Sequence, residues 1–226
     1  MWTTSRDDHA IRSADYDMSS TESRSPERWQ RASEIAGVFL LSVVAVLTAW
    51  CGFQASKWGG EMSIAFSQAS GARIQAANAD GEARSARSFD LTIYAAFVQA
   101  NGEGNDELAD YVRERFTPEF RVAYDAWVED GMVEDGPFAR EEYVPEGSVE
   151  AVELNALADE KFAEALENNQ RGDNYSLLTV LFALVLFLTA MSQRELAPWV
   201  GRTLLGLAIV VAVIGVVILT TFPIRI

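Results

Sequence analysis

The chain has 226 residues, of which 49% are hydrophobic, and its mean hydropathy is +0.03. With 33 Asp and Glu against 18 Lys and Arg, the formal net charge is −15. A chain this acidic repels nucleic acid, so nucleic-acid binding is excluded as an expected function. The only cysteine, Cys51, excludes an internal disulfide.

Residues 1–33 are predicted to be a disordered N-terminal tail. They are rich in Ser, Thr, Asp and Arg and carry few bulky apolar side chains. Such a segment cannot bury enough apolar surface to offset the entropy that ordering would cost. The only histidine, His9, lies in this tail, where it is a poor candidate for a metal ligand or a catalytic base.

Three apolar stretches without a charged residue predict transmembrane helices. They cover residues 35–56, 174–193 and 203–224, which are 22, 20 and 22 residues long. About 20 helical residues cross a hydrocarbon core of about 30 Å, and a backbone in lipid must satisfy its own hydrogen bonds. We place the spans at residues 34–56, 174–193 and 203–224, with residues 194–202 as a short cytoplasmic loop.

The spans contain no Asp, Glu, Lys, Arg or His, the residues that mark proton and ion paths. Small residues four positions apart predict faces for close helix packing. These are Ala45 and Ala49 in the first span, and Ala208 and Ala212 in the third.

The distribution of basic residues predicts the orientation, because Lys and Arg gather on the cytoplasmic side. Three arginines precede the first span and two lie in the loop after the second, against three basic residues on the opposite side: Arg24, Arg28, Arg31, Arg194 and Arg202 against Lys57, Arg171 and Arg225. We therefore expect the N-terminus in the cytoplasm and residues 57–173 outside.

Residues 57–173 are predicted to form an acidic helical domain. From Ser56 to Asp173 the sequence contains 25 Asp and Glu and 10 Lys and Arg, which gives −15. Small apolar residues recur there in the alternating three- and four-residue spacing of a coiled coil: Met62, Ala65, Ala69, Ala72, Ala76, Ala79, Ala83 and Ala86. An alanine seam lets two helices approach closely, although each contact buries little area.

The helix that leads into the second span is the expected partner of this seam. Ser148 is a predicted N-cap, and apolar residues follow at three- and four-residue steps: Ala151, Leu154, Ala158, Phe162 and Ala165. The fold class that we predict is therefore all-α, with three transmembrane helices, a long antiparallel coiled-coil-like stalk and a small helical cap.

The cap is predicted between the two stalk helices. The first helix continues through larger side chains (Phe89, Ile93, Ala96 and Phe97) to a break at residues 101–105, and a short helix covers 106–116. Thr117 and Pro118 begin a further helix, whose Phe120, Ala123 and Trp127 share one face. Asp130 and Gly131 end it, and residues 132–147 are irregular.

One acidic cluster in the cap suggests a weak cation site. Val128-Glu129-Asp130-Gly131 is nearly repeated by Val133-Glu134-Asp135-Gly136, so the candidate metal ligands are Glu129, Asp130, Glu134 and Asp135. Their oxygens suit a hard cation such as Ca²⁺, but the spacing does not fit an EF-hand, and a solvated turn explains the pattern equally well. We expect no cofactor and no catalytic residues, because the sequence offers no nucleophile–base pair, zinc motif or phosphate loop.

Several motifs are similar to those of a family of uncharacterised bacterial membrane proteins. They are residues 49–55 (AWCGFQA), 115–121 (RFTPEFR) with Ala126-Trp127, and 137–139 (PFA) with Tyr143. Those relatives carry three spans around a similar soluble insert, and the likeness covers residues 34–220. The resemblance implies a bacterial origin and the inner membrane, and it supplies no functional residues.

Two functions of different classes follow. The first is a non-enzymatic scaffold that acts through the acidic helical domain, where a protein partner or a second copy of the chain would bind the stalk and cap. The alternative is a subunit of an oligomeric channel or transporter, whose pore would be lined by Ser and Thr of the first span. Under both hypotheses the chain is embedded in the lipid bilayer, which is therefore an expected partner.

Overall fold

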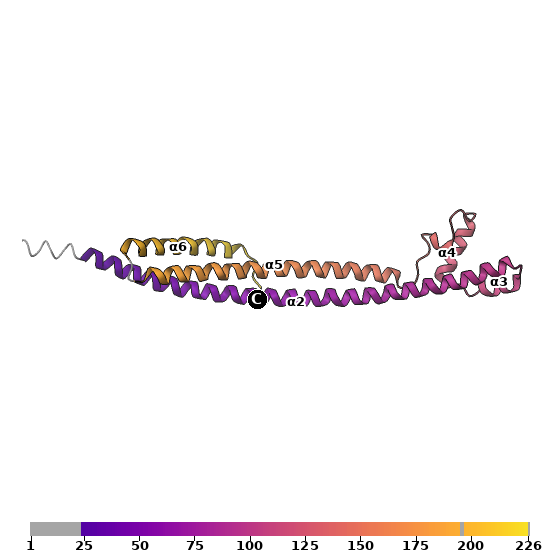
Figure 1. Cartoon of the computed structure of the whole chain (residues 1–226), viewed down its shortest axis with the longest axis horizontal. Coiled ribbons are helices and arrows are strands. Elements are labelled where there is room, and N and C mark those ends of the chain that lie inside the picture. The colour runs from indigo at the N-terminus through magenta and orange to yellow at the C-terminus, as the bar shows by residue number, and fades with distance from the viewer. Residues whose placement is uncertain (1–23, 195–196, 226) are drawn as a thin grey trace, which may run out of the picture. The chain divides into compact units, whose positions relative to one another are not determined.

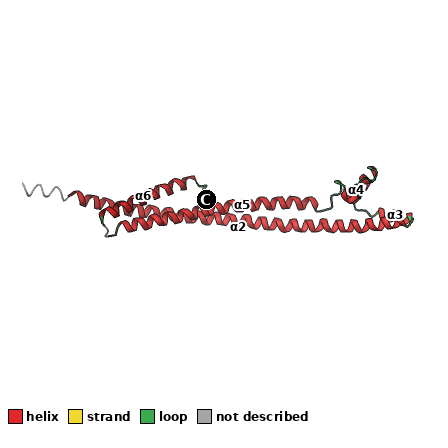
Figure 2. Ribbon diagram, turned by 45° about the horizontal axis from the view of Figure 1, so that its top comes forward, coloured by secondary structure: helices red, strands yellow, loops and turns green. Residues whose placement is uncertain are grey.

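A computed structural model describes residues 24–194 and 197–225, and their side chains from residue 31 onward. The described chain is helical: α2 (Arg24–Gly102), α3 (Asp106–Arg113), α4 (Pro118–Glu129), the 3₁₀ turn η1 (Pro137–Ala139), α5 (Ser148–Ser192) and α6 (Pro198–Thr221) (Figures 1 and 2). Three of these helices, α2, α5 and α6, are long and apolar enough to cross a membrane. The predicted all-α class with three apolar helices is confirmed.

The start of α2 differs from the predicted tail. Residues 24–33 are helical, whereas residues 1–23 of the tail lie outside the described residues. A transmembrane helix need not end at the membrane surface, and this segment contains good helix formers such as Glu, Arg, Gln and Ala, with a proline at position 26 close to its start.

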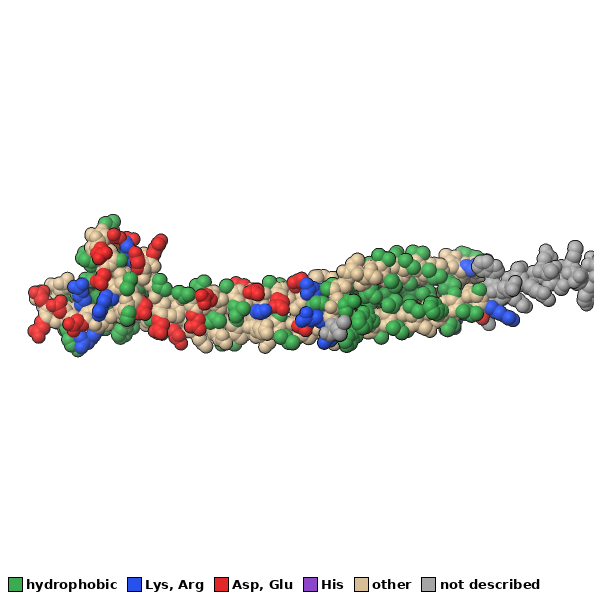
Figure 3. All heavy atoms as spheres, turned by 180° about the vertical axis from the view of Figure 1, so that it is seen from behind, with side chains coloured by type: hydrophobic (Ala, Val, Ile, Leu, Met, Phe, Trp, Pro, Cys, Tyr) green, Lys and Arg blue, Asp and Glu red, His purple; other side chains and the backbone are tan. Residues whose placement is uncertain are grey.

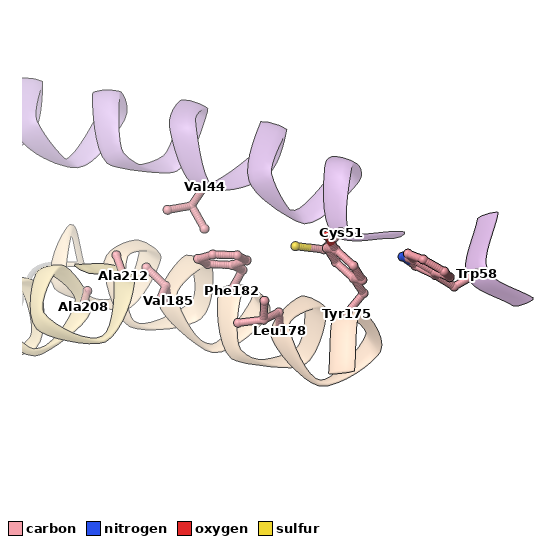
Figure 4. Close-up of a cluster of buried hydrophobic side chains, with 9 residues drawn as sticks. All are labelled: Val44, Cys51, Trp58, Tyr175, Leu178, Phe182, Val185, Ala208 and Ala212. Carbon is pink, nitrogen blue, oxygen red and sulfur yellow. The ribbon is translucent and has the colours of Figure 1, made fainter. Parts of the chain in front are cut away.

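The described residues fall into two compact units, which we treat separately. Unit 1 contains residues up to 59 and from 169 onward, and unit 2 contains residues 60–168. The core of unit 1 takes side chains at seven-residue intervals from α2, at three- and four-residue intervals from α5, and two alanines from α6 (Figure 4). They are Val44, Cys51, Trp58, Tyr175, Leu178, Phe182, Val185, Ala208 and Ala212.

Small residues bring α6 close to α5 within unit 1. Ala208 and Ala212 are buried, as the small-residue spacing predicted. Gly215 continues the same face, and a Cβ at this position would lie 2.8 Å from the ring of Phe182. Ala45 and Ala49 of the first span do not pack within the chain: they are exposed, because α2 turns the larger Val44 and Cys51 toward its neighbours.

In unit 2, the alanines of the predicted seam are buried except Ala86, which is half-buried. Six of them have exposed fractions of 9% or less: Ala65, Ala69, Ala72, Ala76, Ala79 and Ala83. Polar and aromatic contacts join this part of α2 to α5. Arg73 donates to Asn155 at 2.9 Å and pairs with Asp159 at 2.6 Å, and the rings of Phe66 and Phe162 lie 5.5 Å apart. On α5, Ala151, Ala158 and Ala165 are buried.

The short helices of unit 2 begin at polar caps, of which Thr117 was predicted and Asn105 was not. The side chain of Asn105 accepts a hydrogen bond from the backbone N–H of Leu108, and Thr117 accepts one from Phe120. Gly104 and Gly131 take positive φ angles at the ends of α2 and α4, where a left-handed residue closes a helix. The helix predicted at 106–116 ends at Arg113, and residues 114–116 form a turn through the bond from Arg115 N–H to the Val112 carbonyl.

The start of α5 depends on Gly147. The predicted N-cap, Ser148, is instead the first helical residue, and the Gly147 carbonyl accepts the first helical bond, from Ala151. Gly147 has φ +84°, and a Cβ on it would lie 2.5 Å from the carbonyl oxygen of Ala79. The position therefore requires glycine for its backbone angle and for the close approach to α2.

We expect Gly147→Ala to destabilise unit 2 by about 1 to 3 kcal/mol, because the added methyl group forces the start of α5 away from α2. Hydrogen exchange of α5 amides in the purified protein measures the effect. Gly102→Ala is the control, because a Cβ there meets nothing within 4 Å. Equal exchange in the two variants would contradict this role for Gly147.

Candidate functional site

The cap of unit 2 is built around an aromatic cluster. Its buried rings come from α4, from the turn before it and from the segment after η1, and two rings of α2 pack against them: Phe116, Phe120, Tyr124, Tyr143, Tyr94 and Phe97. Phe120 is fully buried, 4.7 Å from the ring of Phe138 and 4.9 Å from that of Phe116. The predicted aromatic face of α4 thus forms the core of the cap.

A buried acidic residue, Asp90, ties three segments of the cap together. Its side chain is 1% exposed and accepts hydrogen bonds from Thr117 Oγ1 at 2.7 Å and from the Tyr143 hydroxyl at 2.9 Å. Burial and the hydrogen bond to Asp90 raise the pKa of Tyr143, so its hydroxyl stays protonated and donates. The Arg87 guanidinium lies 5.7 Å from the Tyr143 ring and brings a positive charge near the cluster.

A second polar cluster surrounds Arg140, beside the predicted cation ligands. Its Nη1 donates to Asp130 and lies 3.4 Å from Glu134, while Nε and Nη2 each donate to Glu142 at 3.0 Å. The Arg140 side chain is only 15% exposed. Its hydrogen bonds lower the pKa of Glu142, and they raise the pKa of Arg140 itself, so the guanidinium stays charged.

Of the four candidate metal ligands, Asp130 and Glu134 therefore come together at Arg140. Glu129 and Asp135 are exposed and are not among the ion-pair partners of Arg140. Among the described residues no group of three or more His, Cys, Asp or Glu side chains is arranged to hold a metal ion. The cation site stays a prediction, and a cation at Asp130 and Glu134 would have to displace the guanidinium.

The ion pair between Arg140 and Glu142 predicts a pH dependence. Because the folded-state pKa of Glu142 is lowered, its contribution to stability is present above the unfolded-state value, about 4.3, and is lost as pH falls through the folded value. Glu142→Gln should therefore melt below the wild-type protein at pH 7, and the difference should shrink as the pH falls below the unfolded-state value of about 4.3. Glu141→Gln is the control. A deficit that does not shrink as the pH falls would show that Glu142 acts by packing.

Unit 2 also has an open hollow on α2 near the start of α4. Its volume is about 860 Å³, and its walls include Gly81, Glu82, Phe89, Thr117 and Glu146. Figure 3 shows acidic side chains spread over the surface of this unit.

Unit 1 carries a buried polar contact that joins its first and last described segments. Gln54 is fully buried; its Nε2 donates to the Arg225 carbonyl and its Oε1 accepts from the Arg225 N–H, both at 3.0 Å. The Tyr175 hydroxyl donates to the Pro223 carbonyl, also at 3.0 Å. The segment after α6 is thereby attached to both α2 and α5.

Sequence reasoning missed Asp90, Arg140 and Gln54. For Asp90 a signal exists, because it lies four residues after Ala86 and thus continues the three- and four-residue spacing of the seam. Phe89, which was expected to continue the apolar face, is instead 52% exposed. Arg140 and Gln54 have no local signal, since their partners are determined by the tertiary fold.

The structure defines the class of the chain, a helical membrane protein with three candidate spans and a helical unit between the first two. Comparison with models of known protein families, with curated proteins and with solved structures finds no match. The family resemblance and its implied bacterial origin stay predictions.

Proposed function

We propose that this protein is a non-enzymatic membrane scaffold that binds a protein partner through unit 2. The observation that carries the proposal is the set of large apolar side chains exposed on unit 2 among its carboxylates. Ile74, Val98 and Val152 are 63%, 50% and 69% exposed, and Ile64 and Leu166 are also more than half exposed. Apolar side chains that form one exposed patch are typical of interaction surfaces, and we take these residues to be parts of such a patch.

In this proposal α2 and α5 form an antiparallel coiled-coil-like stalk that carries the cap. The contacts within unit 2 support it, because rising residue numbers on α2 meet falling numbers on α5: Phe66 meets Phe162, Arg73 meets Asn155 and Asp159, and Ala79 meets Gly147. The buried alanines provide the close contact between the helices. Since the seam is used within the chain, a partner must bind elsewhere on unit 2.

The partner interaction is tested by photo-crosslinking in cells. A benzophenone side chain is placed at Ile74, Val98 or Val152, with Glu129 as the exposed charged control. We expect a discrete adduct from an apolar position and none from the control. An adduct of twice the chain mass would identify a second copy as the partner, and the absence of adducts at all three positions would contradict the proposal.

We further propose the bacterial inner membrane as the location, with the N-terminus in the cytoplasm and unit 2 outside. The arginines before the first span and in the loop after α5 support this orientation, and the family resemblance supports the membrane.

Labelling with a membrane-impermeant thiol reagent tests the orientation. In a Cys51→Ser background, Glu103→Cys should react in intact cells, because it lies in the exposed turn after α2. A cysteine at Arg194, in the predicted cytoplasmic loop, should react only after lysis and is the matched control. The reverse pattern would place unit 2 in the cytoplasm.

A further inference from the structure

We propose that the hollow on unit 2 is the docking site for a basic segment of the partner protein. This inference rests on the proposed function and names the surface and the chemistry of the partner. The hollow lies along one face of α2 and reaches Thr117 at the start of α4 and Glu146 before α5.

The floor of the hollow is formed by small residues, so the backbone of a bound segment can approach it closely. Gly81 lies in the middle of α2, where glycine costs about 1 kcal/mol of helix stability relative to alanine, and a Cβ there would meet nothing within 4 Å. No contact among the described residues therefore requires this glycine. The neighbouring Ser85 hydroxyl donates to the Gly81 carbonyl, so it is held against the helix. The small side chains of the floor leave room for another backbone.

The walls combine an apolar ring with two carboxylates. Phe89 is 52% exposed and lines the hollow, although the other aromatic rings packed in the cap are mostly buried. The ion pairs of the described part of unit 2 do not involve Glu82 or Glu146, which also line the hollow. An aromatic ring beside two carboxylates favours a cationic side chain with an apolar stem, as in Lys or Arg.

The charge of the unit decides between the possible occupants. A second copy would bring another strongly acidic surface against Glu82 and Glu146, so like charges would oppose its docking. A small molecule is disfavoured because its sites enclose most of the ligand, whereas this hollow is open to solvent. A volume of about 860 Å³ instead suits several residues of an extended or helical segment.

The test uses the full chain in an uncharged detergent and a defined probe, the fluorescein-labelled octapeptide Lys-Ala-Lys-Tyr-Lys-Ala-Lys-Gly. Fluorescence anisotropy should show that Glu82→Gln with Glu146→Gln weakens binding by about 10-fold or more. Gly81→Leu, which fills the floor while it favours the helix, should weaken it similarly. The matched control, Glu153→Gln with Glu160→Gln, removes the same charge from unit 2 and should change the affinity by less than about 2-fold.

Equal weakening by the two double variants would mean general charge attraction and would overturn the docking site. Undetectable binding of the probe to the wild-type chain at about 1 mM would overturn it as well. Crosslinking distinguishes failure of the docking site from failure of the proposed scaffold function. If crosslinks from Ile74, Val98 or Val152 persist in the Glu82→Gln, Glu146→Gln variant, the proposed scaffold function stands, but the partner binds outside the hollow. Loss of crosslinks in that variant, but not in the control variant, is the expected result.

Discussion

Replacing Phe120 with Ala should destabilise the cap of unit 2 by about 3 to 5 kcal/mol, the largest effect we expect from a single substitution. The Phe120 ring is fully buried and contacts Phe116, Phe138, Tyr94 and Tyr143 in edge-on or stacked arrangements. Removing it leaves a cavity that these neighbours can fill only in part, and the aromatic contacts that they make with Phe120 are lost as well. The hydrogen-exchange rate of the α4 amides in the purified protein should rise by the amount that this loss of stability implies.

Phe89→Ala is the matched control for this prediction. It removes the same side chain from a half-exposed position on α2, so it should cost much less, about 1 kcal/mol or below. Similar exchange in the two variants would mean that the cap is not held together by its aromatic core. Exchange confined to α4 would show that the cap opens independently of unit 1.

The double substitution Ala72→Leu, Ala76→Leu should destabilise unit 2 by about 2 to 6 kcal/mol, since each added side chain overpacks the seam by about 1 to 3 kcal/mol. Both alanines are at most 6% exposed. The larger side chains have no space unless α2 and α5 separate. Thermal unfolding in mild detergent, together with the size of the solubilised complex, measures the result.

Ala77→Leu provides the comparison, because Ala77 neighbours Ala76 on the same helix but is exposed. It should leave the melting temperature nearly unchanged, since leucine is also a good helix former. If the seam variant were as stable as this control and its complex size stayed the same, the alanines would not be a packing surface.

The parts of the fold that could be predicted depend on short-range patterns. An uncharged apolar run is sufficient to predict a span, and Thr117 followed by Pro118 predicts the start of α4, because both signals act within one helical turn. The alanine seam was equally visible, since its spacing repeats along one helix.

The parts that could not be predicted depend on contacts between distant segments. Asp90 is buried because Thr117 and Tyr143, 27 and 53 residues away, supply its hydrogen bonds. The acidic repeat suggested a cation, yet the positive charge at Asp130 and Glu134 comes from Arg140. Gly147 has the sequence context of an ordinary loop residue, and only its close approach to Ala79 on α2 explains why glycine is required there. Periodicity along one helix carries no information about these partners.

The pairing of Gln54 with Arg225 constrains how the protein is made. The two residues are 171 positions apart, so at a synthesis rate of about 5 to 20 residues per second Gln54 exists for roughly 10 to 30 s before its partner. During that interval its amide must hydrogen-bond to water, to lipid headgroups or to the insertion machinery, because an unsatisfied amide in an apolar environment is costly. Closure of unit 1 around this amide therefore follows the insertion of α6, which makes it a late step in biogenesis.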